Sequence, residues 1–255
     1  MPPDGAQEVT MWFRGLNIFA VWLCSWASVF AAQGPPPEVT AAFDGVIMVE
    51  GTDEFSGAYT VRTISTVQKP NGKARHDMEI VIDVDRPAEG KERRTLVSYV
   101  RDGEDVTEER RAKIEEANDQ EERDPDDGED GESEMEFVAP WGDDAGRYDF
   151  EPPHQVDSTI IQGFRPKLGK KDHEGLAVGR LVWNASTLDP ISVELTVVHP
   201  PKPLKEFRIV MEFERRGDAV YNTRMVTDGL AKVLFMKREF HVDVHWTEIR
   251  PAGPS

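Results

Sequence analysis

The chain has very little cysteine and lacks the motifs of the common hydrolytic and phosphate-binding enzymes. Its one cysteine, Cys24, lies inside an apolar N-terminal run, so neither a disulfide framework nor a cysteine metal site is expected. There is no G-x-S-x-G nucleophile elbow, no phosphate-binding loop and no H-E-x-x-H zinc motif. A basic stripe with interleaved aromatic residues is also missing, which argues against nucleic-acid binding. We therefore expect a protein that is not an enzyme and that needs no cofactor and no metal.

The negative charge is concentrated in one segment. The 255 residues carry a formal net charge of −18, yet Arg101 to Glu136 alone holds 18 acidic and 5 basic residues. Within it, residues 119–134 (DQEERDPDDGEDGESE) contain no apolar side chain, so they bury too little surface to offset the entropy of ordering. We interpret 119–134 as a disordered acidic insert. Its carboxylates lack the spacing of an EF-hand calcium loop, which favours a solvated segment over a calcium site.

The N-terminus has the order of a secretory signal peptide. Arg14 precedes the uncharged run Leu16–Phe30, and the small residues Ala31 and Ala32 follow. We expect cleavage after Ala31, and Met11 is an alternative start. Two other interpretations stay open: a retained membrane anchor over 16–30, and lipidation at Cys24. The anchor is less favoured because 15 helical residues span about 22 Å, whereas the hydrocarbon core of a bilayer is about 30 Å thick.

Strand patterns dominate the remaining chain. Alternating apolar and polar residues, rich in Val, Ile and Thr, predict about ten strands. Pro70-Asn71-Gly72, Asp102-Gly103 and Gly217-Asp218 predict the turns between some of them. The expected strand segments are Phe43–Glu50, Ala58–Gln68, Arg75–Asp85, Arg94–Arg101, Tyr148–Phe150, His154–Lys167, Val178–Trp183, Ile191–Val198, Phe207–Phe213, Ala219–Thr227 and Ala231–Ile249.

These patterns predict a mainly β protein, with an antiparallel sheet curled into an incomplete barrel and one short charged helix. Sequential hairpins build an antiparallel meander with one solvated face and one apolar face, which we call the dry face. A meander of ten strands tends to curl. The helix is expected from Thr107, as its N-cap, to about Asn118. The expected organisation is a signal peptide over 1–31, a linker over 32–42, one β domain over 43–249 interrupted by the insert, and a tail over 250–255.

Alternation assigns a large set of apolar side chains to the dry face. A curled sheet must cover this face or leave it as a cavity, and the single charged helix is poorly suited to cover it. We therefore predict that an apolar ligand binds there, near Trp246. The candidate ligand-binding residues are Met78, Ile80, Ile82, Phe207, Met211, Phe213, Phe240, Val242, Val244 and Trp246, with Leu195 and Ile209 on the same face.

Two polar patterns admit a functional and a plain interpretation. His241, Asp243 and His245 share one face of the last strand, as metal ligands could, but the two histidines are about 13 Å apart along it. An ordinary polar outer face is the favoured interpretation. Asn184-Ala185-Ser186 matches a glycosylation sequon, and the nearby Asp189-Pro190 favours a turn instead.

The second half of the chain resembles the outer-membrane lipoprotein-sorting family, the periplasmic carriers with a LolA/LolB-like fold. The stretch that carries the likeness is Gly179-Arg-Leu-Val-Trp-Asn-Ala-Ser-Thr-Leu-Asp-Pro-Ile-Ser-Val-Glu-Leu195, followed by the strands at 207–213, 221–227 and 240–246. The resemblance implies an incomplete antiparallel barrel, an apolar cavity that shields acyl chains, and no catalysis. The chain departs from the family in offering only one, charged, helix to close the cavity.

Together these features favour an exported periplasmic or envelope protein that binds a lipid, an acyl chain or a lipoprotein in the concave face of a half-barrel. The alternative is a non-enzymatic envelope interaction or scaffold domain with a filled core. The two differ in cavity volume, since an apolar pocket of roughly 300 Å³ or more favours binding. The partners expected are a lipid or lipoprotein and an envelope protein, not a nucleic acid.

The export prediction is testable directly. N-terminal sequencing of protein from the envelope fraction should find a chain that begins just after Ala31. A chain beginning at Met1 or Met11 would exclude cleavage. A chain beginning at an acylated Cys24 would support the lipoprotein interpretation instead.

Overall fold

The computed structural model describes residues 34–50, 55–89, 91–112, 138–167, 175–233 and 236–252. The signal-peptide region, its predicted cleavage site and the acidic insert over 119–134 lie outside these ranges.

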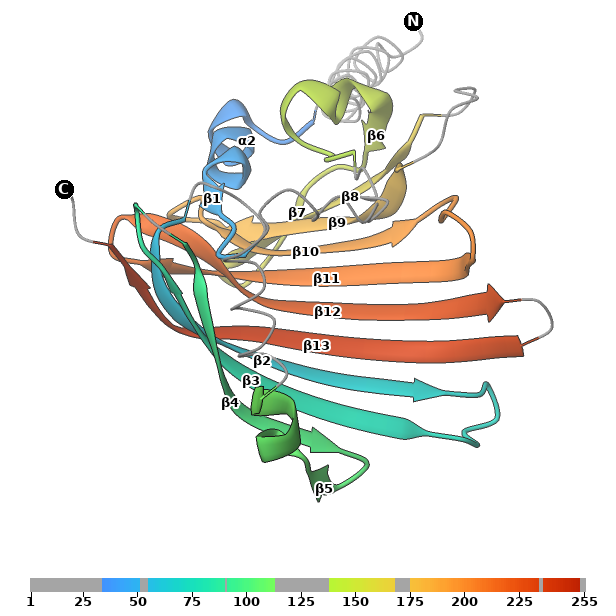
Figure 1. Cartoon of the computed structure of the whole chain (residues 1–255). Coiled ribbons are helices and arrows are strands. Elements are labelled where there is room, and N and C mark those ends of the chain that lie inside the picture. The colour runs from blue at the N-terminus through green and yellow to red at the C-terminus, as the bar shows by residue number, and fades with distance from the viewer. Residues whose placement is uncertain are drawn as a thin grey trace, which may run out of the picture.

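One curled antiparallel sheet forms the body of the molecule, and it is not closed into a barrel (Figure 1). Among the described strands, β5 and β6 end the order and do not pair with each other, so the predicted incomplete barrel is confirmed. In spatial order the strands are β5 (Glu104–Asp105), β4 (Arg93–Arg101), β3 (His76–Arg86), β2 (Gly57–Gln68), β13 (Met236–Pro251), β12 (Ala219–Val233), β11 (Leu204–Arg216), β10 (Pro190–Val197), β9 (Ala177–Asn184), β8 (Thr159–Pro166) and β6 (Tyr148–Phe150).

Two short strands lie off this path. β7 (His154–Val156) pairs with β8, and β1 (Val46–Ile47) pairs with β12 in the one parallel contact among the described strands. The strand order also shows which two strands join the N-terminal and C-terminal parts of the sheet. β2 to β5 form one meander and β6 to β13 another, and the antiparallel pairing of β2 with β13 joins them.

The N-terminal part of the described chain differs from the prediction. A linker was expected over 32–42 and a strand over Phe43–Glu50, but Pro37–Asp44 forms helix α2 and only Val46–Ile47 is a strand. Pro37 suits the first helical position, where its missing N–H costs no hydrogen bond. Val39 and Phe43, four residues apart, are buried on one face of the helix. A helix this short escapes pattern recognition because packing, rather than propensity, stabilises it.

The charged helix begins at residue 107, but Thr107 does not cap it as predicted. The backbone N–H of Thr107 donates to Asp105 Oδ1 at 2.9 Å, so the aspartate two residues earlier takes the capping role. The Thr107 hydroxyl donates to the same oxygen and accepts the backbone N–H of Tyr99 at 2.8 Å. This hydroxyl ties the helix to β4. The helix is described as far as residue 112.

The last predicted strand, Ala231–Ile249, is in fact two elements. β12 runs on to Val233, β13 starts at Met236, and Val233 pairs with Met236 across the two strands. The chain therefore reverses direction where the sequence carries no Gly, Pro, Asn or Asp. The turn at Asn184 is confirmed, because Asn184 Oδ1 accepts the backbone N–H groups of Ser186 and Thr187 at 2.8 and 3.0 Å.

Two clusters of buried side chains fill parts of the concave face. The first lies over β8 to β10, where α2 and the 3-10 helix η2 (Gly142–Arg147) bring Phe43 and Trp141 into stacked contact, with ring centroids 5.2 Å apart. The second contains Val49, Phe55 and Trp246 and covers one end of β2, β3, β12 and β13. Its covering segment is fastened by the Val49 backbone N–H, which donates to the buried Asn222 Oδ1 at 2.7 Å.

Candidate ligand-binding face

The register of the sheet places the predicted apolar residues in rows on one face. Residues directly opposite one another on neighbouring strands point to the same side of a sheet. The row nearest the hairpin ends is His76, Val67, Phe240, Gly229 and Phe207. The next row is Met78, Ser65, Val242, Thr227, Ile209 and Leu195. A third row runs Ile80, Thr63, Val244, Met225, Met211 and Val193.

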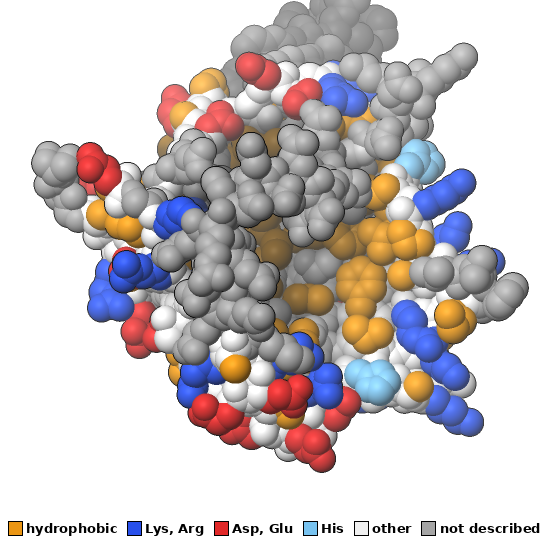
Figure 2. Space-filling model, viewed as in Figure 1, with side chains coloured by type: hydrophobic (Ala, Val, Ile, Leu, Met, Phe, Trp, Pro, Cys, Tyr) orange, Lys and Arg blue, Asp and Glu red, His pale blue; other side chains and the backbone are white. Residues whose placement is uncertain are grey.

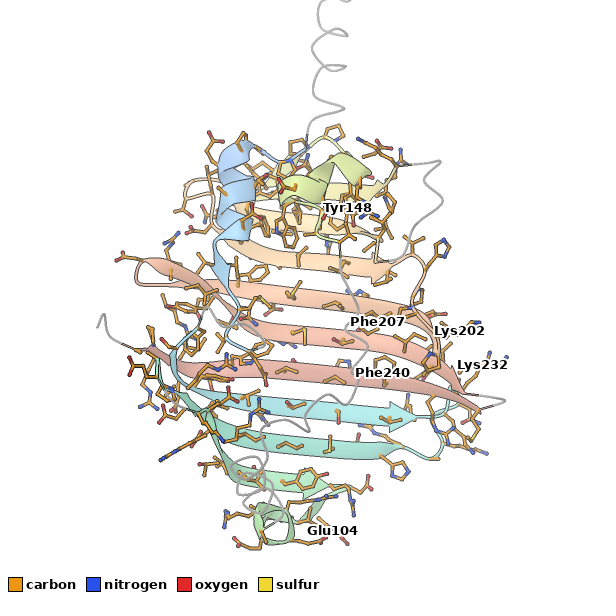
Figure 3. The ribbon with its side chains drawn as sticks, turned by 45° about the horizontal axis from the view of Figure 1, so that its top comes forward. Glu104, Tyr148, Lys202, Phe207, Lys232 and Phe240 are labelled. Atoms are coloured by element: carbon orange, nitrogen blue, oxygen red, sulfur yellow. The ribbon has the colours of Figure 1, made fainter. Side chains whose placement is uncertain are left out.

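The two buried clusters leave part of this face exposed. We call this part the open region and define it by Val67, Met78, Ile80, Phe207, Phe240 and Val242. Each of these side chains is partly or fully exposed among the described residues. Figure 2 shows hydrophobic side chains gathered in the hollow of the concave face, and Figure 3 shows Phe207 and Phe240 on this face, on neighbouring parts of the sheet. Their ring centroids are 6.4 Å apart.

Gly229 gives the open region its shape. It pairs with Phe207 on one side and with Phe240 on the other. A Cβ added at Gly229 would lie 2.2 Å from the tip of the Phe240 ring, so the ring occupies the space that a side chain would take. A glycine inside a strand often marks such a close approach. The Phe240 ring therefore lies flat across β12 instead of standing away from the sheet.

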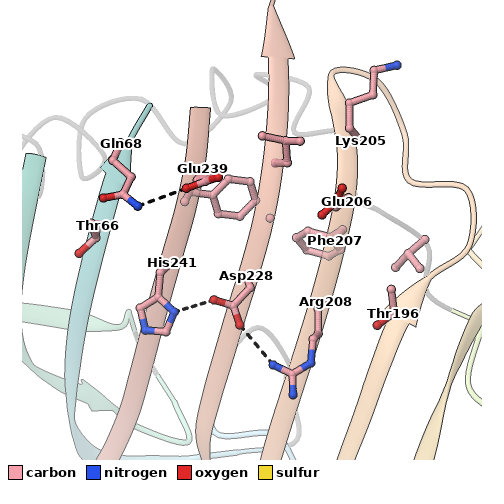
Figure 4. A pocket seen from close by; sticks show the side chains of 14 residues that line it. Thr66, Gln68, Thr196, Lys205, Glu206, Phe207, Arg208, Asp228, Glu239 and His241 are labelled. Atoms are coloured by element: carbon pink, nitrogen blue, oxygen red, sulfur yellow. Dashed lines mark hydrogen bonds and ion pairs between the residues drawn. The ribbon is translucent and has the colours of Figure 1, made fainter. Parts of the chain in front are cut away.

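A pocket of about 690 Å³ lies at this end of the sheet (Figure 4). Phe207, Gly229 and Phe240 contribute to its lining, together with the polar groups of Arg208, Asp228 and His241. The volume falls in the range of small-molecule sites, which is about 300–1,000 Å³. The polar residues alternate with the phenylalanines along each strand and so belong to the opposite, outer face. Most of the lining therefore lies on the outer face at the rim of the sheet, and the pocket is not a cavity of the concave face.

Charged side chains on the outer face form continuous rows across the strands. Arg180 and Arg208 both bind Glu194 at 2.6 Å, and Arg208 continues to Asp228, which lies 2.7 Å from His241. Burial acts to raise the pKa of Glu194, but the hydrogen bond from Arg208 and the charges of both arginines outweigh it and lower that pKa. Opposite charges facing each other across strands stabilise this face.

His241, Asp243 and His245 do not converge as metal ligands would. His241 contacts Asp228, whereas His245 Nε2 lies 3.0 Å from Asp243 Oδ1. Both oxygens of Asp243 accept hydrogen bonds from Arg224 at 2.9 Å. Within the described ranges, no group of three or more His, Cys, Asp or Glu is arranged to hold a metal ion. The carboxylates of the acidic insert, which were weighed as a calcium site, lie outside those ranges.

The structure distributes the predicted binding residues over three environments. Val244 and Trp246 belong to the second buried cluster, against which Ile82 and Val242 pack. Met211, Phe213 and Phe207 pack against the first cluster, so Phe207 and Val242 lie where the clusters border the open region. Only Met78, Ile80, Phe207, Phe240 and Val242 of the predicted set lie in the open region. Trp246 is 4% exposed and donates from Nε1 to Glu50, so it is remote from the exposed surface of the face.

Sequence reasoning missed several residues of the concave face. Val67 was not assigned, although it continues the alternation of β2 beyond Ser65. Tyr99 and Leu96 are both buried beside Ile80 and Ile82, although an odd spacing of three separates them. A β-bulge explains this: Ser98 pairs with Val81 and Leu96 with Ile82, which leaves Val97 unpaired and exposed. No residue in the sequence signals the bulge.

Comparison with known proteins leaves the family open. No family model matches the sequence, and no curated protein sequence matches it. The solved structures with some likeness include a DUF1329 family protein from Desulfovibrio piger, with 11% identity, 86% of this chain and 92% of that chain covered, and a TM-score of 0.32. The MucA/MucB complex of Pseudomonas aeruginosa gives 10% identity, coverage of 85% and 100%, and a TM-score of 0.20.

A second structure, of MucB in complex with periplasmic MucA, gives 11% identity, coverage of 77% and 94%, and a TM-score of 0.17. Scores this low do not establish a common fold. Among the described residues, no helix is both long enough and apolar enough to cross a membrane.

The ion pair of Asp243 provides a test of the outer face. The hydrogen bonds from Arg224 lower the pKa of Asp243, so its contribution to stability is present above the unfolded pKa of about 3.9 and disappears as pH falls through the lower folded pKa. At pH 7, Asp243→Asn should reduce the free energy of unfolding by about 2 kcal/mol, because Arg224 loses the closer of its two charged partners and keeps only Glu212.

Urea unfolding of the parent and Asp243→Asn between pH 7 and pH 3 would measure this difference, which should shrink toward pH 3. Asp149→Asn, the same substitution at an exposed carboxylate, is the matched control and should change little. A difference that stays constant with pH would show that the Arg224 interaction does not depend on the carboxylate charge.

Proposed function

We propose that this protein is an exported envelope protein that binds an apolar ligand, a lipid, an acyl chain or a lipoprotein, on the concave face of its half-barrel. The single observation that carries the proposal is the open region, where Phe207, Phe240 and Met78 are partly exposed between the two buried clusters of the concave face. Adjoining exposed apolar residues of this kind mark interaction surfaces in soluble proteins.

The shape of the region supports a chain-like ligand over a compact one. The first two rows cross β2, β13, β12 and β11, so apolar groups continue from strand to strand in one direction. Ser65 and Thr227 are small and buried between bulkier neighbours, and the Phe240 ring fills the space above Gly229, so the rows form a continuous surface. An acyl chain is long, narrow and flexible, and burial of each methylene contributes about 0.8 kcal/mol.

The second candidate, a scaffold domain, is supported by the two filled clusters. Leu181, Val193 and Leu195 are fully buried, so much of the face is packed as an ordinary core. The two candidates differ only in whether the open region accepts a ligand. Non-enzymatic action and a periplasmic location are part of both.

The binding proposal predicts saturable uptake of a dansyl-labelled fatty acid with a blue-shifted emission. An external probe is preferable because Trp183 and Trp246 are buried and Trp141 stacks on Phe43, away from the open region. Phe240→Asp should raise the Kd at least tenfold, about 1.4 kcal/mol, since it places a charge in the apolar rows. The probe should also raise the Tm of the parent, because a ligand that binds only the folded state stabilises it.

The matched control is Val178→Asp, which introduces the same charge at an exposed apolar residue on the outer face and should leave the Kd unchanged. Equal effects of the two substitutions, or a parent that shows neither saturation nor a Tm shift, would reject ligand binding. The scaffold interpretation would then stand.

A further inference from the structure

Three hairpin ends at one edge of the sheet carry only positive charge. Residues 68–76 join β2 to β3, 198–205 join β10 to β11, and 230–238 join β12 to β13. Together they contain eight lysines and arginines and no carboxylate, in a chain whose net charge is −18. The register places all three at the same end of the strands, next to the row of Phe207 and Phe240. We call the six lysines among them the lysine edge: Lys69, Lys73, Lys202, Lys205, Lys232 and Lys237.

The charges of the lysine edge are not used to hold the fold. All six lysines are exposed, and none takes part in an ion pair within the described part of the chain. Lys202 and Lys232, labelled in Figure 3, lie at the ends of neighbouring hairpins. Of the arginines on the same hairpins, Arg75 is bound to Asp77 at 2.8 Å. The ammonium groups of the lysine edge are therefore available to bind an external anionic partner.

The opposite end of the same strands is built differently. There Glu92 binds Arg86 and Arg94, Asp189 binds Arg215, and Glu214 binds Arg216. Both ends consist of hairpin turns, so turn geometry does not account for the difference. The lysines at one end of the sheet repel one another, which destabilises the free protein. An anionic partner at this end would relieve that repulsion.

Exposed apolar side chains accompany these lysines. Six large hydrophobic residues are exposed among those described, and three of them lie on or beside these hairpins: Val67, Val198 and Met236. Met236 is the most exposed, at 53%, and is followed directly by Lys237. Figure 2 shows the blue lysines and arginines along this rim, next to hydrophobic side chains of the hollow. Basic residues interleaved with apolar ones are typical of surfaces that bind at the headgroup layer of a bilayer and bury their apolar side chains there.

We propose that the lysine edge docks this protein onto a bilayer of anionic lipid. Each lysine that comes near such a surface strengthens binding about fivefold at moderate salt. The acidic remainder of the chain is repelled, so the protein would approach with this edge first. Val67, Val198 and Met236 then enter the headgroup layer, and the open region faces the membrane. The inference stands on exposure and charge alone and does not require that the concave face holds a ligand.

Vesicle co-sedimentation tests the proposal with protein purified from the envelope fraction, so that its natural N-terminus is present. The parent should bind vesicles of phosphatidylcholine with about 30% phosphatidylglycerol at least tenfold more strongly than pure phosphatidylcholine vesicles, and added salt should weaken this binding. A variant with the edge neutralised should lose at least tenfold in affinity for the anionic vesicles; it carries Lys69→Gln, Lys73→Gln, Lys202→Gln and Lys232→Gln.

The matched control removes the same number of positive charges from the opposite end, with Lys91→Gln, Arg93→Gln, Arg216→Gln and Arg250→Gln. It should keep the parent's affinity within about twofold, because only charges near the surface act on it. Equal losses in both variants, or equal binding of the parent to both kinds of vesicle, would overturn the proposal. So would binding of poly-glutamate through the edge without binding of anionic vesicles, since the edge would then serve a protein partner. The dansyl probe separates this result from ligand binding, because the lysine substitutions lie outside the open region.

Discussion

The antiparallel pairing of β2 with β13 is the interaction on which the rest of the structure depends. It runs from Gly57 opposite Pro251 to Gln68 opposite Glu239, and it joins the two meanders into one sheet. Residues more than 170 positions apart must meet to form it, as the bond from Gln68 to Glu239 shows. Closing so long a loop costs conformational entropy, which side-chain burial along the seam offsets. Without this pairing, each meander would present an exposed edge strand.

The concave face follows from that seam. Because β2 and β13 are in register, Val67 and Ser65 extend the rows of Phe240 and Val242 onto the N-terminal meander. The segment after α2 then covers one end of the seam, where Val49, Phe55 and Trp246 are buried together. The other end keeps its apolar rows partly exposed and continues into hairpins rich in lysine. A binding face and a basic edge are therefore neighbours for a topological reason, since both lie at the uncovered ends of the same strands.

Local pattern was sufficient to predict most strands and the side on which their apolar residues lie. The alternation of Met78, Ile80 and Ile82, and of Phe240, Val242 and Val244, is reproduced by the register. The features that depend on distant contacts escaped prediction. These were the β2–β13 seam, the packing of α2 through Val39 and Phe43, and the bulge that exposes Val97. The candidate site was predicted in part only, because coverage by α2 and the segment after it decides which apolar residues stay exposed, and that coverage is tertiary.

The central claim is that the open region accepts an apolar chain while the two clusters remain closed. Methyl NMR with ¹³C-labelled methionine and a fatty acid that carries a nitroxide near its methyl end tests it most directly. Met78 lies in the open region, whereas Met236, on the hairpin end, is the most exposed large hydrophobic side chain among the described residues and reports random collisions. If the open region accepts an acyl chain, the Met78 signal is lost before that of Met236, and excess unlabelled fatty acid restores it. Loss at Met236 alone, with the Met78 signal intact at saturating probe, would contradict the account.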